Sequence, residues 1–324
     1  MVDSPEVSAA ETINKDDCLS IKQKLNSKLN LALNKRKREN SKIDKPVKQK
    51  KIMKASEKSR SIDNFKHLSI KIEEKLAVVC VQKPGSISNL EIIEELESAL
   101  KLIDSNKDIS VTLLMPECGV TYSDLDLSSV LDADLEIRTS NAYQLAESIR
   151  SLLTTVADHS KLLCTGVNSR CTGVALALVA LSDLTLASER ASFSIAVKSQ
   201  GPGPVEPGVS ALTAYRDLPQ PLLNDLVVFG RRVSAAEALR NGLVGRVLWP
   251  ERFNEQVLTI AADIAAQPSH NIWLKKQMLS LKNRSSNTFQ NCLEKERDIF
   301  MEYWISEEGQ ELLRTIHHID TGII

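Results

Sequence analysis

The sequence is short of the residues that hold metal ions or cross-link small folds. Its six cysteines contain no CxxC pair, and of the five histidines only His317 and His318 are adjacent. Metal ligands come in clusters at characteristic spacings, so we expect free thiols and no metal ion. Long apolar runs are lacking too, and none reaches the roughly 18 residues of a membrane span. We therefore expect a soluble protein without a membrane partner.

The usual import signals are also missing. The first residues are acidic rather than basic, which argues against a mitochondrial presequence, and they contain no apolar core of a secretory signal. The last four residues, 321–324, are not a peroxisomal address. We therefore expect no mitochondrial import, no secretion and no peroxisomal import.

Residues 1–66 are poor in aromatic side chains and hold only Phe65. Such a segment cannot bury enough apolar surface to offset the entropy cost of ordering, so we predict a disordered tail over 1–66. One stretch of the tail has an apolar residue at every fourth position between lysines. This pattern indicates a short amphipathic helix over 19–34, which either folds on a partner or forms only transiently. Its apolar residues are Ile21, Leu25, Leu29 and Leu33.

The same tail is strongly basic. Between Lys22 and Lys66 there are sixteen Lys/Arg against four Asp/Glu, although the whole chain has a net charge of -1. Two clusters are typical of nuclear localisation signals or nucleic-acid patches, and the alternative is a solvated charge run without a receptor. Because no aromatic residues stand between the charges to stack on bases, we expect at most non-specific, salt-sensitive nucleic-acid binding. The clusters consist of Lys35, Arg36, Lys37 and Arg38, and of Lys48, Lys50 and Lys51.

From residue 67 onward the pattern is that of a folded α/β domain. Apolar runs with strand character alternate with helical periodicity, which favours crossover connections between strands. Predicted strands cover 68–72, 76–81, 109–114, 161–167 and 184–187. Predicted helices include residues 92–103, 145–156 and 173–181. A Gly/Pro-rich loop follows at 201–208, and further helices are predicted over 235–241, 253–265, 272–281, 288–303 and 307–316. Ser234 and Glu237 form a capping box at the start of one of them, and Gly242 is placed to end it.

Two motifs in this domain resemble the crotonase superfamily, the enoyl-CoA hydratase/isomerase fold. The stretch VNSRCTGVALAL at 167–178, followed by Asp183, is similar to the family's central turn and helix. The stretch GRRVSAAEALRNGLVGRV at 230–247 matches the family signature G-R-x-[IV]-[ST]-A-x-E-A…G-L-V-x-x-V nearly residue for residue. The resemblance implies a ClpP-like spiral of ββα units over 67–250, C-terminal helices over 251–324, and a homotrimer.

Three details are similar to one branch of the superfamily, the crotonase-like domain of chromodomain Y-like nuclear corepressors. These are WPERF at 249–253, LEKER at 293–297, and a basic tail before the domain. The chromodomain itself needs a small sheet and an aromatic cage for methyl-lysine, and residues 1–66 have neither. We therefore expect that the chain does not read methylated histone by itself.

The resemblance also places the residues of an active site. It implies backbone donors to a thioester oxyanion at Ser123 and Val174, with Thr172 and Gly173 beside them in the ligand pocket. Val174 stands where the family has glycine, and Asp124 adds negative charge near the oxyanion. Both differences oppose catalysis.

The carboxylates that move protons in the family are missing. The resemblance places their positions at Ala177 and Val197, and neither residue has a side chain that can accept or donate a proton. Glu206 in the Gly/Pro loop is the nearby replacement, and a solvated loop acid is the expected state for it. Asp126 and Asp183 match family positions, and we expect them to be turn or capping residues rather than catalysts.

The preferred hypothesis is a catalytically degenerate crotonase-fold scaffold in the nucleus, with chromatin or transcription complexes as protein partners. It needs no cofactor, although residual CoA or acyl-CoA binding stays open. One alternative is an acyl-CoA hydratase or isomerase that uses Glu206 as a displaced acid/base. Another is a nucleic-acid binder that works through the basic tail.

Overall fold

The computed structural model describes residues 60–62, 65–82, 90–116, 125–195, 206–281 and 287–320. All of them belong to one compact unit, residues 57–324. Both basic clusters and the predicted helix over 19–34 lie outside the described residues. None of the helices in the described ranges is long and apolar enough to span a membrane.

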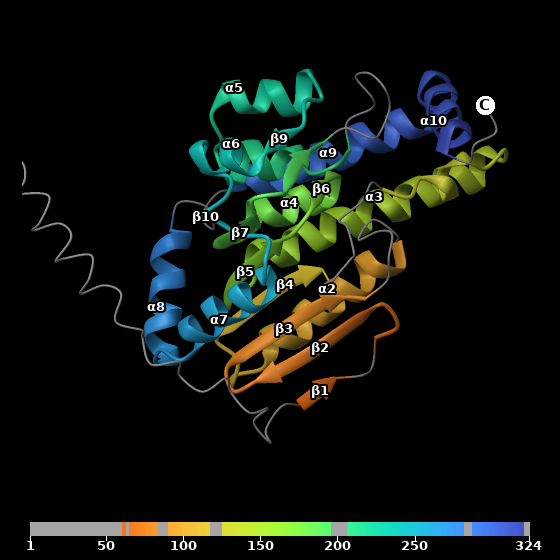
Figure 1. Ribbon diagram of the computed structural model, residues 1–324. Coiled ribbons are helices and arrows are strands. Elements are labelled where there is room, and N and C mark those ends of the chain that lie inside the picture. Colours follow the sequence, from red (N-terminus) through yellow and green to blue (C-terminus); the bar gives the residue numbers. More distant parts are fainter. Residues whose placement is uncertain are drawn as a thin grey trace, which may run out of the picture. The chain divides into compact units, whose positions relative to one another are not determined.

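A seven-stranded sheet forms the centre of this unit, in the spatial order β1-β2-β3-β4-β5-β7-β10 (Figure 1). The first three strands are antiparallel, and β3, β4, β5, β7 and β10 run parallel to one another. A small second sheet has the order β6-β8-β9. The bounds in the large sheet are β1 Arg60–Ile62, β2 Leu68–Glu73, β3 Leu76–Val81, β4 Val111–Pro116, β5 Leu162–Val167, β7 Leu184–Ser188 and β10 Arg246–Leu248. The small sheet contains β6 Arg170–Thr172, β8 Ser192–Ser194 and β9 Val233–Ser234.

The helices confirm the predicted alternation of strands and helices, followed by a helical C-terminal part. They are α2 Leu90–Ser105, α3 Leu135–Asp158, α4 Gly173–Leu181, α5 Gln220–Leu223, α6 Ala235–Arg240, α7 Phe253–Ala265, α8 Ser269–Ser280, α9 Asn287–Ile305 and α10 Glu307–Asp320. A short 3-10 helix at Ser128–Leu131 and two π-helical turns, Ala211–Tyr215 and Asn224–Val228, were not predicted.

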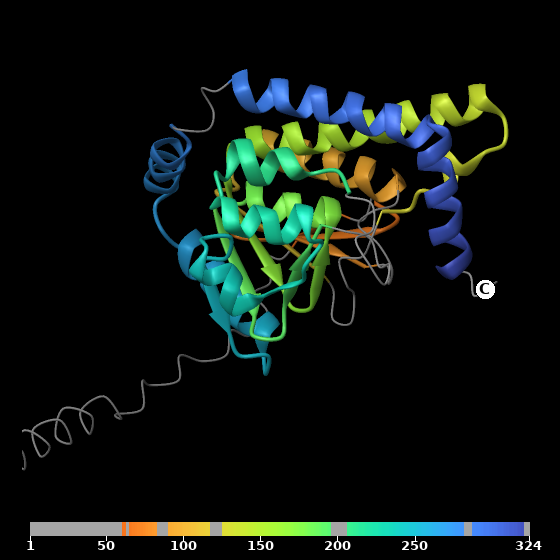
Figure 2. The ribbon, with the colours of Figure 1, turned by 90° about the horizontal axis from the view of Figure 1, so that it is seen from above.

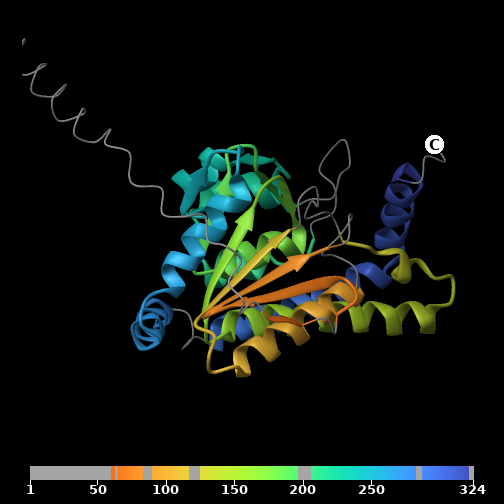
Figure 3. The ribbon, with the colours of Figure 1, turned by 60° about the horizontal axis from the view of Figure 1, so that its bottom comes forward.

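Alternate residues of the central strands serve two different cores, because successive side chains of a strand point to opposite faces. Val78 and Leu113 pack with Phe253 and Val257 of α7, whereas neighbouring residues of the same strands belong to the core formed with α2, α3 and α4. Figures 2 and 3 show α2, α3 and α9 side by side along one face of the sheet. The sheet is therefore covered on both faces, which suits its parallel strands.

The sheet also begins earlier than the predicted start of the domain at residue 67. Strand β1 lies inside the segment predicted as tail, and its backbone pairs antiparallel with β2, from Arg60 opposite Ile72 to Ile62 opposite Ile70. Ladder hydrogen bonds need no apolar side chains, so a polar sequence can add an edge strand. The central sheet therefore includes residues 60–62 of the segment predicted as tail.

Candidate functional site

Helix α4 forms the floor of the candidate site. All nine of its residues are buried, as expected for a helix that is apolar on every side. Strand β6 leads into it, and Gly173 makes the turn with a φ of 53°, a left-handed conformation that favours glycine. This first turn is where the family resemblance places an oxyanion-binding backbone.

The side chain of Glu206 lies directly over that turn. It is 1% exposed, and its Oε1 accepts the backbone N–H of Leu125 at 3.0 Å. A Cβ added to Gly173 would be 1.3 Å from Glu206 Oε2, so the carboxylate is in contact with the α-carbon of this glycine. Glu206 thus connects the chain that follows β4 to the start of α4.

The expectation that Glu206 is a solvated loop acid is wrong. A carboxylate can be buried when hydrogen bonds and a helix dipole replace its hydration. Leu125 supplies such a donor to Oε1, and Oε2 lies against Gly173, the first residue of α4. Leu125 and Gly173 are both remote from Glu206 in sequence. The composition of the Gly/Pro loop alone therefore does not predict these contacts.

The predicted pocket residues are only partly within the described chain. Thr172 and Val174 are fully buried on either side of Gly173, and the Val174 side chain packs within the hydrophobic core. Ser123 lies outside the described residues. An apolar cavity of ≈ 10 Å³ lies against α4, lined in part by Thr165, Ala175 and Leu178, and has room for about one water molecule.

Ala177, where the resemblance places the family's first carboxylate, has no ionisable side chain and little space around it. Ala177 is fully buried, and a Cβ added to Gly208 would be 2.6 Å from the Ala177 Cβ. The backbone of Gly208 therefore packs against the side of α4 where the family side chain would project. Val197, at the second carboxylate position, lies outside the described residues.

A second glutamate holds the same segment from the opposite side. Glu296 of α9 accepts backbone N–H groups through Oε1 from Gly208 at 3.1 Å, Val209 at 2.7 Å and Ser210 at 3.3 Å. Burial raises the pKa of the Glu296 carboxyl above its ordinary value, although these N–H groups act in the opposite direction. The segment 206–210 is thus fixed between α4 and α9.

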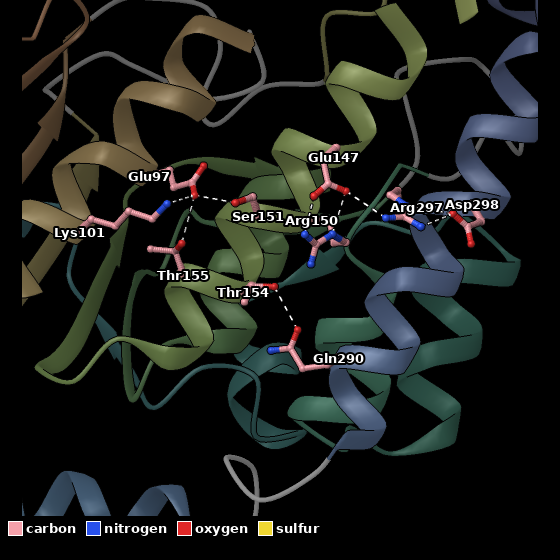
Figure 4. A network of polar contacts seen from close by, with 10 residues as sticks. All are labelled: Glu97, Lys101, Glu147, Arg150, Ser151, Thr154, Thr155, Gln290, Arg297 and Asp298. Atoms are coloured by element: carbon pink, nitrogen blue, oxygen red, sulfur yellow. Dashed lines mark hydrogen bonds and ion pairs between the residues drawn. The ribbon is translucent and has the colours of Figure 1, made fainter. Parts of the chain in front are cut away.

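Helix α9 is in turn fastened to α3 (Figure 4). Arg297, the residue after Glu296, donates to Glu147 Oε2 at 3.1 Å, and Thr154 donates to Gln290 Oε1 at 3.2 Å. Arg150 pairs with the same Glu147. These contacts give Glu296 a fixed support.

Of the two aspartates at family positions, Asp126 lies in a turn, as predicted, whereas Asp183 forms an ion pair that was not predicted. Asp126 Oδ1 accepts the N–H of Ser128 at 3.0 Å and is a turn residue. Asp183 Oδ2 accepts the N–H of Leu163 at 2.7 Å and pairs with Lys276 at 2.6 Å. The Lys276 side chain is 1% exposed, so this buried ion pair attaches α8 to the sheet. Sequence reasoning missed it because lysine is rarely buried unless it is paired, and its partner Asp183 is remote in sequence.

The parallel sheet, the ββα units and the turn into α4 together define a crotonase-type domain. A sequence profile described as enoyl-CoA hydratase/isomerase matches residues 71–315, so the chain belongs to this family. The predicted crotonase fold is confirmed by solved structures. The enoyl-CoA hydratase/isomerase from Pseudoalteromonas atlantica T6c superposes with a TM-score of 0.63 at 20% identity, covering 78% of this chain and 97% of that one. The enoyl-CoA hydratase from Mycobacterium avium subsp. paratuberculosis K-10 also gives 0.63, at 19% identity, covering 77% and 100%.

Two kinds of protein are similar in sequence. Chromodomain Y-like protein 2 of Mus musculus is 26% identical over 253 residues, which cover 77% of this chain and 49% of that protein. Enoyl-CoA delta isomerase 2 of Homo sapiens is 25% identical over 252 residues, which cover 77% of this chain and 62% of that protein. The chain spans half or less of the length of its chromodomain Y-like relatives.

Proposed function

We propose that this chain is a nuclear scaffold on a crotonase fold and that it does not hydrate enoyl thioesters. The packing of Gly208 on Ala177 carries the proposal, because it fills the place of the first catalytic carboxylate. Hydration needs one group to activate water and one to deliver a proton, each contributing about 10² to 10⁴ in rate. A site without this pair of groups is better suited to binding than to hydration.

The sequence similarity and the basic tail support the nuclear part of the proposal. The relatives include chromodomain Y-like proteins, and the tail carries the two clusters, 35–38 and 48–51, expected of an import signal. The proposed partners are protein components of chromatin or transcription complexes. A homotrimer, as the resemblance implies, would strengthen weak contacts through avidity.

Three experiments test this function with the full chain. The purified protein should leave crotonyl-CoA unchanged, and measurable hydration contradicts the proposal. When the chain is fused to a DNA-binding domain in cells, a reporter beside the binding site should change its output, and an unchanged reporter argues against a scaffold. Alanine at the seven Lys/Arg positions of the two clusters should prevent nuclear accumulation, whereas alanine at seven Lys/Arg positions elsewhere in the tail should not.

A second candidate, an enoyl-CoA isomerase, is favoured by the buried position of Glu206 at the start of α4. Moving a double bond needs no water and only one acid/base group. That group takes a proton from C2 of a 3-enoyl thioester and returns one to C4 of the resulting dienolate. One relative is named enoyl-CoA delta isomerase 2. Conversion of 3-hexenoyl-CoA that disappears in Glu206→Gln would support this candidate over the scaffold.

A further inference from the structure

The surface around α6 is positively charged, although the domain as a whole is acidic. Residues 67–324 contain 24 Lys/Arg against 33 Asp/Glu, whereas residues 229–252 contain five arginines and two glutamates. Arg231 pairs with Asp225 at 2.7 Å and with Glu237 at 2.9 Å. The other four arginines are exposed, and their guanidinium groups have no hydrogen bond or ion pair with the described part of the chain. They are Arg232, Arg240, Arg246 and Arg252.

The same region exposes two aromatic side chains. Phe229, just before β9, is 70% exposed, and Trp249, directly after β10, is 69% exposed, more than any other large apolar side chain of the described residues. Gln256 Nε2 donates to the carbonyl oxygens of Trp249 at 3.1 Å and Glu251 at 2.9 Å, so the turn that presents Trp249 is fixed on α7. Single exposed apolar side chains are common on protein surfaces, but two aromatic rings among unpaired arginines are a specific combination.

The turn between β7 and β8 brings the two ends of this region together. Glu189 donates its backbone N–H to the carbonyl oxygen of Leu248 at 2.9 Å, and the carbonyl oxygen of Ala191 accepts the N–H of Ala235 at 3.1 Å. The first contact fixes the chain that leaves β10, and the second fixes the start of α6. The turn itself carries one charge of each sign, Glu189 and Arg190, and leaves the positive balance unchanged.

Helix α6 connects the remaining parts of this surface. It contacts both β9 and β10, and Figure 1 shows the three elements together. The ion pair of Arg231 with Glu237 keeps the segment 229–232 beside the first turn of α6. Arg240 stands at the end of this six-residue helix, about 9 Å along its axis. We call the surface the arginine face and define it by Phe229, Arg232, Arg240, Arg246, Trp249 and Arg252.

An arginine is unfavourable for stability at the position of Arg252. This residue is the N-cap of α7 and has a φ of 60°, a left-handed conformation that disfavours residues with a side chain. Its positive charge also opposes the dipole at the start of the helix. Strained residues cluster at sites that bind or react. A role of Arg252 in binding accounts for both features.

The composition of the arginine face fits an unpaired strand of nucleic acid. Its cations are all arginines, and the chain has no lysine between Lys198 and Lys275. A planar guanidinium binds phosphate through two N–H groups and stacks on bases, whereas the ammonium group of lysine does neither. Aromatic rings stack on unpaired bases, and a duplex hides the faces of its bases. An acidic peptide would use the arginines but not the rings.

We propose that the arginine face binds single-stranded nucleic acid, with bases stacked on Phe229 and Trp249 and phosphates held by the four arginines. Because the turn that presents Trp249 is already fixed, little entropy is lost when a base stacks on the ring. The attraction expected of the two basic clusters in the tail is separate, since it involves no stacking and is sensitive to salt. The proposal goes beyond the scaffold function and does not depend on it.

Binding is measured with the full chain in which the seven Lys/Arg of the two tail clusters are alanine, so that the tail contributes little. Fluorescence anisotropy of labelled oligouridylate and oligothymidylate of about 12 nucleotides, in about 0.15 M salt, gives the affinity. Trp249→Ala should weaken binding about tenfold or more, and Trp249→Phe, which keeps a ring, should weaken it less. Trp273→Ala, at an exposed position of α8 outside the arginine face, is the matched control and should bind as before. Equal affinity of Trp249→Ala and Trp273→Ala overturns the proposal.

Two further measurements distinguish stacking from a general attraction of anions. The oligonucleotide should quench the tryptophan emission of Trp273→Ala and leave that of Trp249→Ala nearly unchanged. The double variant Arg232→Ala/Arg252→Ala should bind about tenfold more weakly and depend less on salt, whereas Arg314→Ala, at an exposed position of α10, should not.

A competition experiment decides between nucleic acid and an acidic protein. Unlabelled oligonucleotide should displace the labelled strand far better than a polyglutamate peptide of the same charge. Equal displacement by the peptide contradicts the proposal, because it identifies an acidic protein as the partner. The tighter of the two oligonucleotides identifies RNA or DNA as the preferred strand.

Discussion

Helix α6 and the helical stretch 209–215 both begin against a glutamate carboxylate, but they obtain it in different ways. At α6 the carboxylate is local: Glu237 Oε2 accepts the N–H of Ser234 at 2.9 Å, and Ser234 Oγ accepts the N–H of Glu237 at 3.3 Å. At 209–215 the carboxylate comes from Glu296, more than eighty residues later in the chain. The first arrangement lies at the surface and the second is buried beside the candidate site.

The difference in burial changes what each carboxylate does. Hydrogen bonds from Ser234 and Arg231 lower the pKa of Glu237 to about 2, and solvent remains available to it. Burial instead raises the pKa of Glu296. A local cap therefore stabilises one helix end, whereas the distant carboxylate joins two parts of the domain and makes the site depend on α9.

The largest loss of stability is expected at Gly173, because the Glu206 carboxylate leaves no space for a side chain there. Gly173→Ala places a Cβ into the Glu206 carboxylate at a positive φ, and we expect a loss of about 3–5 kcal/mol in the free energy of unfolding. Gly242→Ala, at the end of α6, is the matched control: its φ is 78° but nothing lies within 4 Å, so about 1 kcal/mol is expected. Urea denaturation measures both.

A double variant separates strain from collision at Gly173. Adding Glu206→Ala to Gly173→Ala should recover part of the loss, because it removes the atoms that the new Cβ meets and leaves only the backbone strain. Strictly additive losses would show that the carboxylate does not lie on Gly173.

The next largest effect concerns the support from α9. Glu296→Ala leaves three backbone N–H groups without their charged acceptor in a buried place, and a loss of about 2–3 kcal/mol is expected. Glu296→Gln should lose less, since its amide oxygen still accepts a hydrogen bond. Equal losses in Glu296→Ala and Glu237→Ala, measured by urea denaturation, would remove the distinction between the buried and the exposed carboxylate.

The same distinction decides what could be predicted from the sequence. The capping box at Ser234 and the bounds of α4 and α7 follow from neighbouring residues, and the structure confirms them. The burial of Glu206 could not be predicted, because its donor Leu125 and its contact Gly173 are brought to it only by the tertiary fold. A family pattern identified the positions Ala177 and Val197, but it could not show which segment fills the space beside α4.

Buried polar residues were not predicted either, because their partners are remote in sequence. The sequence contains no indication that Lys276 is buried, and Asp183 pairs with it inside the domain. The π-helical turns at Ala211–Tyr215 and Asn224–Val228 have no periodic signature in so short a stretch. Hydrophobic periodicity thus located the regular elements, and non-local polar contacts determined the candidate site.

A moderate effect is expected at the surface cap. Ser234→Ala removes the side-chain acceptor of the capping box, and about 1 kcal/mol of stability should be lost. Ser234→Thr keeps the acceptor and serves as the control. Because α6 is distant in sequence from the segment 206–210, exchange at the Leu125 amide should stay as in the wild type. A change there would mean that the two helix starts are coupled.

The smallest and most specific effect is a pH response of opposite sign at the two carboxylates. Glu237 has a folded pKa of about 2, below its ordinary 4.5, so its contribution to stability is present above 4.5 and is lost as the pH falls toward 2. Glu296 has a raised pKa, so its contribution is present below 4.5 and is lost as the pH rises through the folded value. As the pH falls, the stability of Glu237→Gln should therefore approach that of the wild type. The stability of Glu296→Gln should fall further below that of the wild type. Urea denaturation of the three proteins between pH 3 and pH 7 measures this, and a shift in the same direction for both variants would show that the two carboxylates share one kind of environment.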